Sequence, residues 1–267
     1  MNASVSTKLI ALQRLLEKME SVLVAFSGGI DSSLVLKVAH GTLGTRALAV
    51  TAVSPTFPAV ELETARRVST EIGARHLIIE ADQLEIPEFV RNDASRCYHC
   101  KTDLYQTLDK LRRDMSLTAT VDGTNLDDLD DVRPGLAAAR EWGVRSPLVD
   151  AGLCKADVRA LAKELGLSNW DKPAAACLSS RIPHGVVITR ESLSRVDQAE
   201  ETLFEEGFRQ VRVREHGDTA RIELGASEIE GLLDWSRRAR VSAKLKSLGY
   251  RFVTLDLEGY RRGGGNG

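Results

Sequence analysis

Short apolar runs alternate with amphipathic stretches over the first two-thirds of the chain, which is typical of strands alternating with helices. The apolar runs predict four strands, at residues 22–26, 46–53, 75–80 and 118–125. The amphipathic stretches predict an N-terminal helix with Leu9, Leu12, Leu16 and Met19 on one stripe, and helices near 31–40, 58–72, 99–113 and 155–165. Such alternation indicates a parallel, doubly wound α/β sheet, which binds ligands at the carboxyl ends of its strands. We therefore expect binding residues in the loops after Phe26, Val53 and Val121.

The hydrophobic period changes near residue 189. Thr189 can cap a helix that reaches about Glu206, and the strictly alternating stretch 209–224 predicts a hairpin that turns at Gly217–Asp218. Its core face should carry Val211, Val213, Ala220, Ile222 and Leu224. A helix near 226–247 and a strand at 252–257 complete a smaller α+β module. The expected organisation is an α/β domain at 1–171, a linker at 172–188, the module at 189–260 and a disordered tail at 261–267.

The charge balance and the short apolar runs argue against several classes of protein. The 267 residues include 36 basic and 38 acidic side chains, a balance that argues against a nucleic-acid-coating or membrane-surface protein. No apolar run approaches the roughly 20 residues of a membrane span, and the N-terminus has no apolar signal core. We expect a cytoplasmic protein, in which thiols stay reduced and four cysteines need not form disulfides.

The string SGGIDSS follows the first predicted strand. Consecutive glycines, Gly28 and Gly29, let backbone N–H groups converge, and the next helix directs the positive end of its dipole to the same place. Ser27, Ser32 and Ser33 add hydroxyl groups. These features indicate a polyphosphate site, although it is not a Walker A loop. A tight strand–helix turn with a capping serine is the alternative.

The full S-G-G-x-D-S string resembles the pyrophosphate (PP) loop of the N-type ATP pyrophosphatases, which have a HUP-like α/β fold. The strings DGTNLDDLDDVRPGL (122–136) and VTAVSP agree with this resemblance. It implies phosphate contacts from Ser27, Gly28, Gly29, Asp31 and Ser32, magnesium binding by Asp31, and adenosine contacts from Thr51, Ser54 and Thr124. Arg133 could neutralise a phosphate or pair with one of the nearby acidic residues, Asp127, Asp128, Asp130 and Asp131. A solvated helix start is the alternative for those aspartates.

The string RCYHCK (96–101) contains two cysteines, Cys97 and Cys100, separated by two residues. A redox pair, a zinc site and an iron–sulfur anchor all begin with this spacing, so the spacing alone does not choose among them. Cys154 precedes a predicted helix, and we expect it to be structural.

Over nearly its whole length the chain resembles the LarE-type ATP-dependent sulfur transferases of nickel-pincer nucleotide cofactor biosynthesis. The resemblance is carried by SGGIDSS, GTNLDD, KADVRALAKELGL, WDKPAAACLSSRIPHG and VRVREHGDTARIEL. It implies that a carboxylate of pyridinium-3,5-dicarboxylic acid mononucleotide is adenylated and converted to a thiocarboxylate, with release of AMP and pyrophosphate. It also implies a small-molecule nucleotide substrate, a sulfide donor and a homo-oligomer, a hexamer in the family.

The source of the sulfur depends on the cysteines. Family members with only the equivalent of Cys177 sacrifice its sulfur, whereas this chain adds Cys97 and Cys100, as cluster-bearing members do. The resemblance therefore implies a [4Fe–4S] cluster held by Cys97, Cys100 and Cys177 that delivers a sulfide. Sacrificial transfer from Cys177, a zinc site completed by His99 or His184, and a redox pair remain open.

A phosphate of the acceptor could bind to the polar face of the hairpin. Arg212, Arg214 and Arg221 alternate with the core residues, and Ser180 and Arg181 follow Cys177. A solvated basic face is the alternative. Glu200 or Glu201 could add a metal or acid–base role. A tRNA thiolase and a non-enzymatic nucleotide sensor with structural zinc are the competing functions, and the near-neutral charge disfavours the first.

Overall fold

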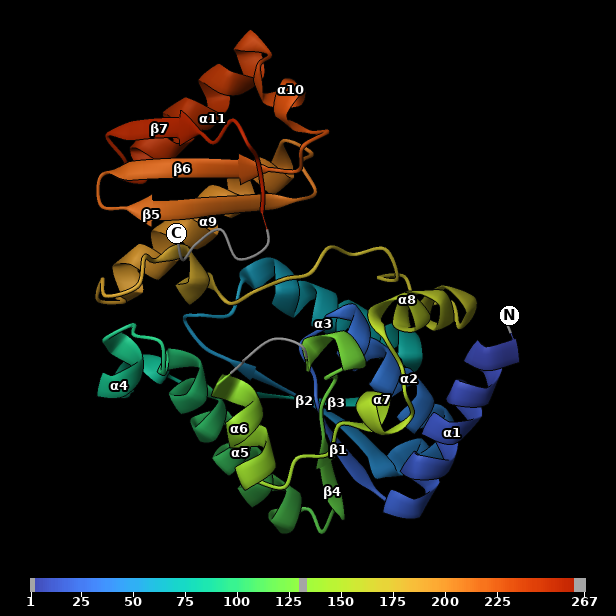
Figure 1. Cartoon of the computed structure of the whole chain (residues 1–267). Coiled ribbons are helices and arrows are strands. Elements are labelled where there is room, and N and C mark those ends of the chain that lie inside the picture. Colours follow the sequence, from blue (N-terminus) through green and yellow to red (C-terminus); the bar gives the residue numbers. More distant parts are fainter. Residues whose placement is uncertain (1–2, 130–133, 262–267) are drawn as a thin grey trace. The chain divides into compact units, whose positions relative to one another are not determined.

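The computed structural model describes residues 3–129 and 134–261, which form two compact units (Figure 1). The first unit takes in the described residues up to Ser54, together with Val60–Ala81 and Cys97–Ala175. The second contains Pro55–Ala59, Asp82–Arg96 and the described residues from Ala176 onward. Two segments predicted within the first domain thus group with the C-terminal module. Asp130, Asp131, Arg133 and all of the predicted tail except Arg261 lie outside the described residues.

The sheet of the first unit is parallel, with the strand order β3-β2-β1-β4. Its strands are β1 (Val22–Ala25), β2 (Ala47–Val53), β3 (Arg75–Glu80) and β4 (Ala119–Val121). β4 is shorter than the predicted 118–125, because the Asp122 carboxylate accepts a hydrogen bond from Thr124 N (3.1 Å) and turns the chain. Since β1 and β4 are neighbours, the loops that follow them start side by side at the carboxyl end of the sheet.

Helices cover both faces of this sheet, which confirms the predicted doubly wound α/β fold (Figure 1). Alternate residues of β1 point to opposite faces, so Val22 and Val24 enter one core and Leu23 enters the other. The first core is covered by α1 (Ala3–Met19), α2 (Ile30–Leu43), α3 (Ala59–Ile72), α7 (Pro147–Asp150) and α8 (Lys155–Glu164). The second is covered by α5 (Arg96–Asp114) and α6 (Pro134–Glu141).

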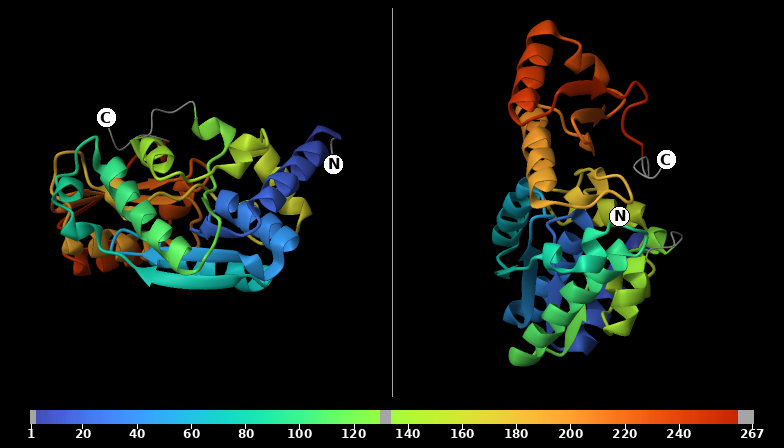
Figure 2. Two further views of the ribbon diagram at one scale, coloured as in Figure 1. Left: turned by 90° about the horizontal axis from the view of Figure 1, so that it is seen from below. Right: turned by 90° about the vertical axis from the view of Figure 1, so that its left-hand side faces the viewer.

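The second unit contains a three-stranded sheet with the order β5-β6-β7. β5 (Val211–His216) and β6 (Thr219–Leu224) form the predicted hairpin, and β7 (Phe252–Leu255) runs parallel to β6. α9 (Arg190–Glu205) and α11 (Trp235–Ser247) pack on this sheet (Figure 2), and all five residues predicted for the core face of the hairpin are buried in one core. α4 (Pro87–Val90) also belongs to this unit.

The helix predicted near 226–247 is divided into α10 (Ile229–Leu232) and α11. Asp234 causes the break, because its Oδ1 accepts a hydrogen bond from Arg237 N (2.9 Å) and caps a new helix. The strand predicted at 252–257 ends at Leu255. Among the described residues, no helix is both long enough and apolar enough to cross a membrane.

The close approach of Gly123 to α2 gives a test of this packing. A Cβ at Gly123 would lie 2.6 Å from Ser32 N, so Gly123→Ala should displace backbone and lower the free energy of unfolding by about 1–3 kcal/mol. Gly41→Ala, within α2 and with no atom within 4 Å of the added Cβ, is the matched control and should be neutral or stabilising by up to about 1 kcal/mol. Urea unfolding measures both, and equal losses in the two variants would contradict the packing argument.

Candidate functional site

The loop between β1 and α2 can form only with glycine at position 28. Gly28 has a φ of 72°, and a Cβ there would lie 2.8 Å from Ala65 N in α3. The Ser32 hydroxyl closes the loop from inside, since it donates to Gly29 O (3.1 Å) and accepts from Ser27 N (3.3 Å). The loop therefore presents exposed Ser27 and half-buried Gly29 at the N-terminus of α2, the geometry that suits an anion.

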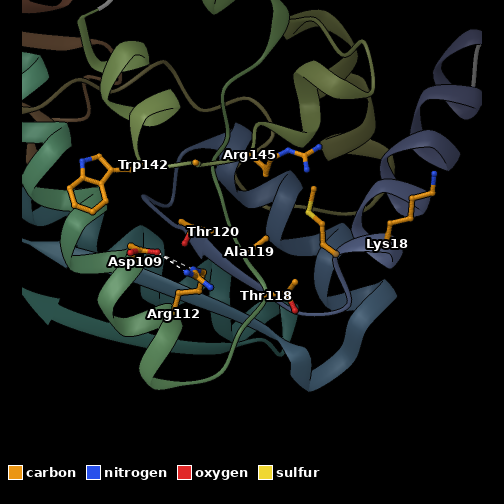
Figure 3. A pocket seen from close by; sticks show the side chains of 10 residues that line it. Lys18, Asp109, Arg112, Thr118, Ala119, Thr120, Trp142 and Arg145 are labelled. Atoms are coloured by element: carbon orange, nitrogen blue, oxygen red, sulfur yellow. Dashed lines mark hydrogen bonds and ion pairs between the residues drawn. The ribbon is translucent and has the colours of Figure 1, made fainter.

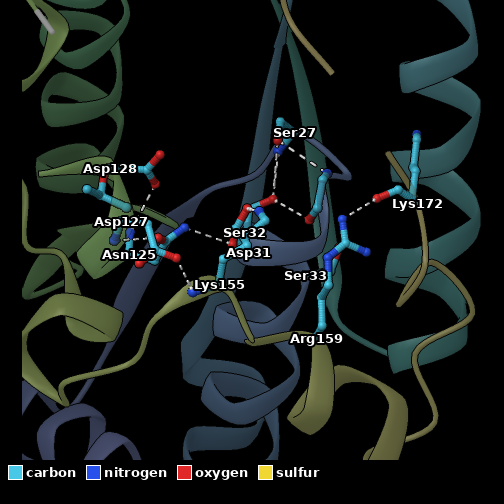
Figure 4. A network of polar contacts seen from close by, with 12 residues as sticks. Ser27, Asp31, Ser32, Ser33, Asn125, Asp127, Asp128, Lys155, Arg159 and Lys172 are labelled. Carbon is cyan, nitrogen blue, oxygen red and sulfur yellow. Dashed lines mark hydrogen bonds and ion pairs between the residues drawn. The ribbon is translucent and has the colours of Figure 1, made fainter. Parts of the chain in front are cut away.

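Asp31 in the first turn of α2 joins three segments of the chain (Figure 4). Its Oδ1 accepts a hydrogen bond from Asn125 Nδ2 (3.1 Å), and its Oδ2 forms an ion pair with Lys155 Nζ at the start of α8. The Lys155 backbone N–H in turn donates to Asp127 Oδ2 (2.7 Å). Asp31, Asn125 and Asp127 are thus brought together around Lys155.

Lys155 was not predicted as a site residue. The KADVR string carries part of the family resemblance, but 124 residues separate Lys155 from Asp31, so no local pattern in the sequence reveals the pair. Its side chain is 31% exposed, so the ammonium group lies beside the glycine loop with access to solvent.

Asn169 is a second residue that the sequence analysis missed. Its side chain is 3% exposed and its Nδ2 donates to Gly28 O (2.9 Å) and to Ser33 Oγ (2.9 Å). Asn169 therefore holds the glycine loop from its buried side. A buried amide that satisfies a backbone carbonyl stabilises a conformation that glycine alone would leave free.

Thr51 and Thr124 already have partners inside the protein. Thr51 is fully buried, and its hydroxyl donates to Phe26 O (2.7 Å) and contacts His76 Nε2 (2.8 Å). Thr124 Oγ1 donates to Asp122 Oδ2 (2.8 Å). Both hydroxyls have a structural role at the strand ends, and their contacts with adenosine stay predictions. Ser54, directly after β2, also stays a candidate.

The residues predicted to bind a substrate phosphate come together in the second unit. They are Ser180, Arg181, Arg212, Arg214 and Arg221. Their face of the hairpin is buried rather than solvated, since Arg212 and Arg214 are only 8% and 6% exposed. Glu223 neutralises part of the charge by accepting two hydrogen bonds from Arg214 (both 2.9 Å) and one from Arg221 (3.0 Å).

Arg181 holds the backbone around Cys177. Its guanidinium donates through Nε and Nη2 to Glu200 (2.8 and 2.7 Å), a carboxylate that is 3% exposed. Its Nη1 donates to the carbonyls of Ala176 (2.7 Å) and Cys177 (2.9 Å). These contacts leave at most one of the five N–H groups for a phosphate, so they give Arg181 a positioning role.

Arg212 occupies a different environment from its neighbours. Its Nη1 donates to Val211 O (2.6 Å), and its guanidinium lies 5.2 Å from the centre of the Tyr260 ring. Burial, and next the positive charge of Arg181, lower the pKa of Arg212. A lowered pKa means that an added negative charge would be favourable at this position.

The four cysteines are free thiols. Cys97 and Cys100 lie on the first turn of α5, three residues apart and therefore on one face, with Cys97 exposed. Cys177 is also exposed and precedes the turn Leu178–Arg181. Cys154 caps α8 through Asp157, where the sequence had placed it.

No group of three or more His, Cys, Asp or Glu side chains within residues 3–129 and 134–261 is arranged to hold a metal ion. Cys97 and Cys100 belong to the first unit and Cys177 to the second. The three-cysteine site therefore stays a prediction.

Comparison with known proteins adds to this geometry. Residues 10–113 match the asparagine synthase family. Pyridinium-3,5-bisthiocarboxylic acid mononucleotide synthase of Lactiplantibacillus plantarum is 42% identical over 262 residues, 98% of this chain and 94% of that protein. An uncharacterized protein of Synechocystis is 42% identical over 257 residues, 96% of each chain. An uncharacterized protein of Methanocaldococcus jannaschii is 30% identical over 257 residues, 95% of this chain and 97% of that one.

His76 contacts the Thr51 hydroxyl, which donates to Phe26 O just before the glycine loop. Its imidazole therefore supplies a pH-dependent test of this packing. Burial, and next the charge of Arg66, lower the pKa of His76 below its ordinary value of 6.5. The unfolded state then binds more protons, so the stability that neutral His76 contributes is present above pH 6.5 and is lost as the pH falls toward the folded pKa. The free energy of unfolding should fall more between about pH 7.5 and 5.5 in the wild type than in His76→Gln. If the stability of the wild type and of His76→Gln falls in parallel over this pH range, the lowered pKa of His76 is wrong.

Proposed function

This chain belongs to the family of LarE-type ATP-dependent sulfur transferases, and we propose that it converts a carboxylate of pyridinium-3,5-dicarboxylic acid mononucleotide into a thiocarboxylate. The enzyme is an ATP-dependent sulfurtransferase, and AMP and pyrophosphate are the other products in this proposal. The reaction would take place in the cytoplasm, which keeps the thiols reduced.

The observation that carries the proposal is the convergence on Asp31. A carboxylate, an ammonium group from Lys155 and the glycine loop meet at the N-terminus of a helix at the carboxyl end of a parallel sheet. This combination suits a magnesium-bound polyphosphate, since the loop and the cation favour phosphate oxygens and the carboxylate is a ligand that Mg²⁺ prefers. Bound Mg²⁺, held by Asp31, would neutralise phosphate charge.

The first step of the proposed reaction activates the acceptor. A carboxylate oxygen of the acceptor attacks the α-phosphate of ATP, an O–P bond forms, and pyrophosphate leaves with the electrons of the α–β bond. Backbone N–H groups of Gly28 and Gly29, and the Lys155 ammonium, would stabilise the charge that develops on the leaving group. In the second step a sulfur nucleophile attacks the adenylated carbonyl, a C–S bond forms and AMP leaves.

The cysteines hold the sulfur donor in this proposal. A [4Fe–4S] cluster held by Cys97, Cys100 and Cys177 would carry the sulfide, since three thiolates leave one iron open. The fit is supported by Arg96, which directly precedes Cys97, is 6% exposed and donates to Ser179 O (2.9 Å), two residues after Cys177. That hydrogen bond, within the second unit, links the two cysteine-bearing segments.

The buried arginines support binding of the acceptor's phosphate. Arg212 and Arg214 extend from β5, and Arg214 donates to Ser180 O (2.8 Å) in the turn after Cys177. A phosphate held beside this turn would bring the acceptor's carboxylate to the thiol-bearing segment. Arg221 shares Glu223 with Arg214 and would adjust the charge of the site. The family's hexamer is part of the proposal and can be measured by light scattering.

Loss of the Lys155 charge should slow activation without unfolding the protein. Lys155→Met keeps the length of the side chain but removes the cation, and we expect the rate of pyrophosphate release to fall about 10²–10³-fold. Lys163→Met, on the exposed side of the same helix, is the matched control and should retain wild-type activity. Pyrophosphate release within about threefold of wild type in Lys155→Met, with the fold retained, would remove Lys155 from the site.

Iron analysis of protein purified without oxygen separates the sources of sulfur. We expect about four irons per chain, loss of iron in Cys97→Ser, retention in Cys154→Ser, and repeated turnover when sulfide is supplied.

Three other outcomes support the alternatives. If product stops at one sulfur per chain and Cys177 loses the mass of H₂S, the sulfur comes from Cys177 itself. Stoichiometric zinc that is lost in His99→Ala would indicate a structural zinc site. Salt-sensitive tRNA binding would favour a tRNA thiolase.

A further inference from the structure

A cavity of about 440 Å³ lies in the first unit beside the amino end of β4 (Figure 3). It is far along the strand direction from the glycine loop, which follows the carboxyl end of β1. Its walls come from the end of α1, the C-terminal half of α5, β4, and the residues that follow α6. The residues of the proposed sulfur-transfer site do not line it.

The walls of this cavity are positively charged. The charged side chains that line it are three basic ones, Lys18, Arg112 and Arg145, and one acidic one, Asp109, which leaves a formal charge of +2. Hydrogen bonds from Arg112 and Arg113 lower the pKa of Asp109, so its carboxylate is ionised and already engaged. Arg145 bonds Asp150 (2.8 Å) from a side chain that is 52% exposed, and Lys18 is exposed on α1. An anion would complete the charge balance.

Thr120 is an independent sign that a ligand belongs here. This β4 residue lines the cavity and is 5% exposed, yet its Oγ1 has no hydrogen-bond partner among the described residues. Buried hydroxyls are normally satisfied, and this oxygen is itself shielded from solvent, so a ligand could supply the missing partner only after the side chain turns toward the cavity. The guanidinium of Arg112 is oriented by hydrogen bonds to Asp109 Oδ1 (3.2 and 2.8 Å) and to Leu117 O (3.0 Å).

Half-buried Trp142 forms an aromatic wall of the same cavity. The volume falls within the range of small-molecule sites and is larger than a single inorganic ion needs. A flat ring can pack on the indole while its charged group meets the cations.

We propose that this cavity is a binding site for a small aromatic anion, a ring that carries a carboxylate or a phosphate group. The charged group lies among Lys18, Arg112 and Arg145 and accepts the hydrogen bond of Thr120, and the ring contacts Trp142. The proposal goes beyond sulfur transfer and does not depend on it.

NMR of the tryptophan indole N–H groups tests the site directly, because the chain has only three tryptophans and Trp142→Phe identifies the relevant signal. The full-length protein is titrated with phenyl phosphate, with benzoate and with inorganic phosphate. We expect a saturable shift of the Trp142 signal with at least one of the two aromatic anions. Comparison of phenyl phosphate with benzoate shows whether the site binds a phosphate or a carboxylate group, and inorganic phosphate tests the need for a ring.

Charge variants on one helix provide the matched comparison. Lys18→Gln should weaken binding about threefold to tenfold, whereas Arg14→Gln, one turn earlier on α1 and outside the cavity, should leave it unchanged. Thr120→Val, which removes only the hydroxyl, should also weaken binding, and its effect can be read even if Lys18→Gln proves unstable.

Two results would overturn the proposal. One is a Trp142 signal that neither aromatic anion moves in a saturable way. The other is an equal loss of affinity in Lys18→Gln and Arg14→Gln, which would indicate attraction to the general charge of α1. If inorganic phosphate binds as tightly as phenyl phosphate, the ring contact with Trp142 is wrong. Since none of these measurements uses ATP or the sulfur acceptor, failure here leaves the proposed enzyme function untouched.

Discussion

The carboxylate of Asp31 is the contact on which the first unit's site depends. One oxygen accepts from Asn125 and the other pairs with Lys155, so a single side chain fixes the positions of α2, the loop after β4 and the start of α8. Gly123 allows this approach, since any side chain there would meet the backbone of Ser32. Three segments that are distant in sequence therefore converge where a polyphosphate would bind.

Charge organises the second unit differently. Arg181–Glu200 and Arg214–Glu223 are paired ions that have lost nearly all contact with solvent. Such pairs contribute little net stability, because the cost of desolvation offsets most of their attraction. Their value here is positional: Arg181 fixes the carbonyls of Ala176 and Cys177, and Glu200 also accepts from Val213 N (2.9 Å).

Much of the fold could be predicted from the sequence, because the patterns that specify strands and helices are local. Strand and helix periodicity predicted the doubly wound sheet, and alternation in 209–224 predicted which hairpin residues form the core. The break at Asp234 was missed because a capping side chain interrupts an otherwise continuous helical pattern. Lys155 and Asn169 could not be predicted, since their roles depend on partners more than 100 residues away. Arg181 differs, since its partners lie within 19 residues along the chain: the residue type suggested phosphate binding, and its contacts with Glu200 and with the carbonyls of Ala176 and Cys177 add a positioning role.

The central claim is that the site around Asp31 cleaves ATP between the α and β phosphates to activate a carboxylate. Phosphorus NMR of ATP incubated with the enzyme, Mg²⁺ and the acceptor follows this cleavage directly. The account predicts that AMP and pyrophosphate appear in equal amounts, and only when the carboxylate acceptor is present. Formation of ADP and inorganic phosphate would contradict it.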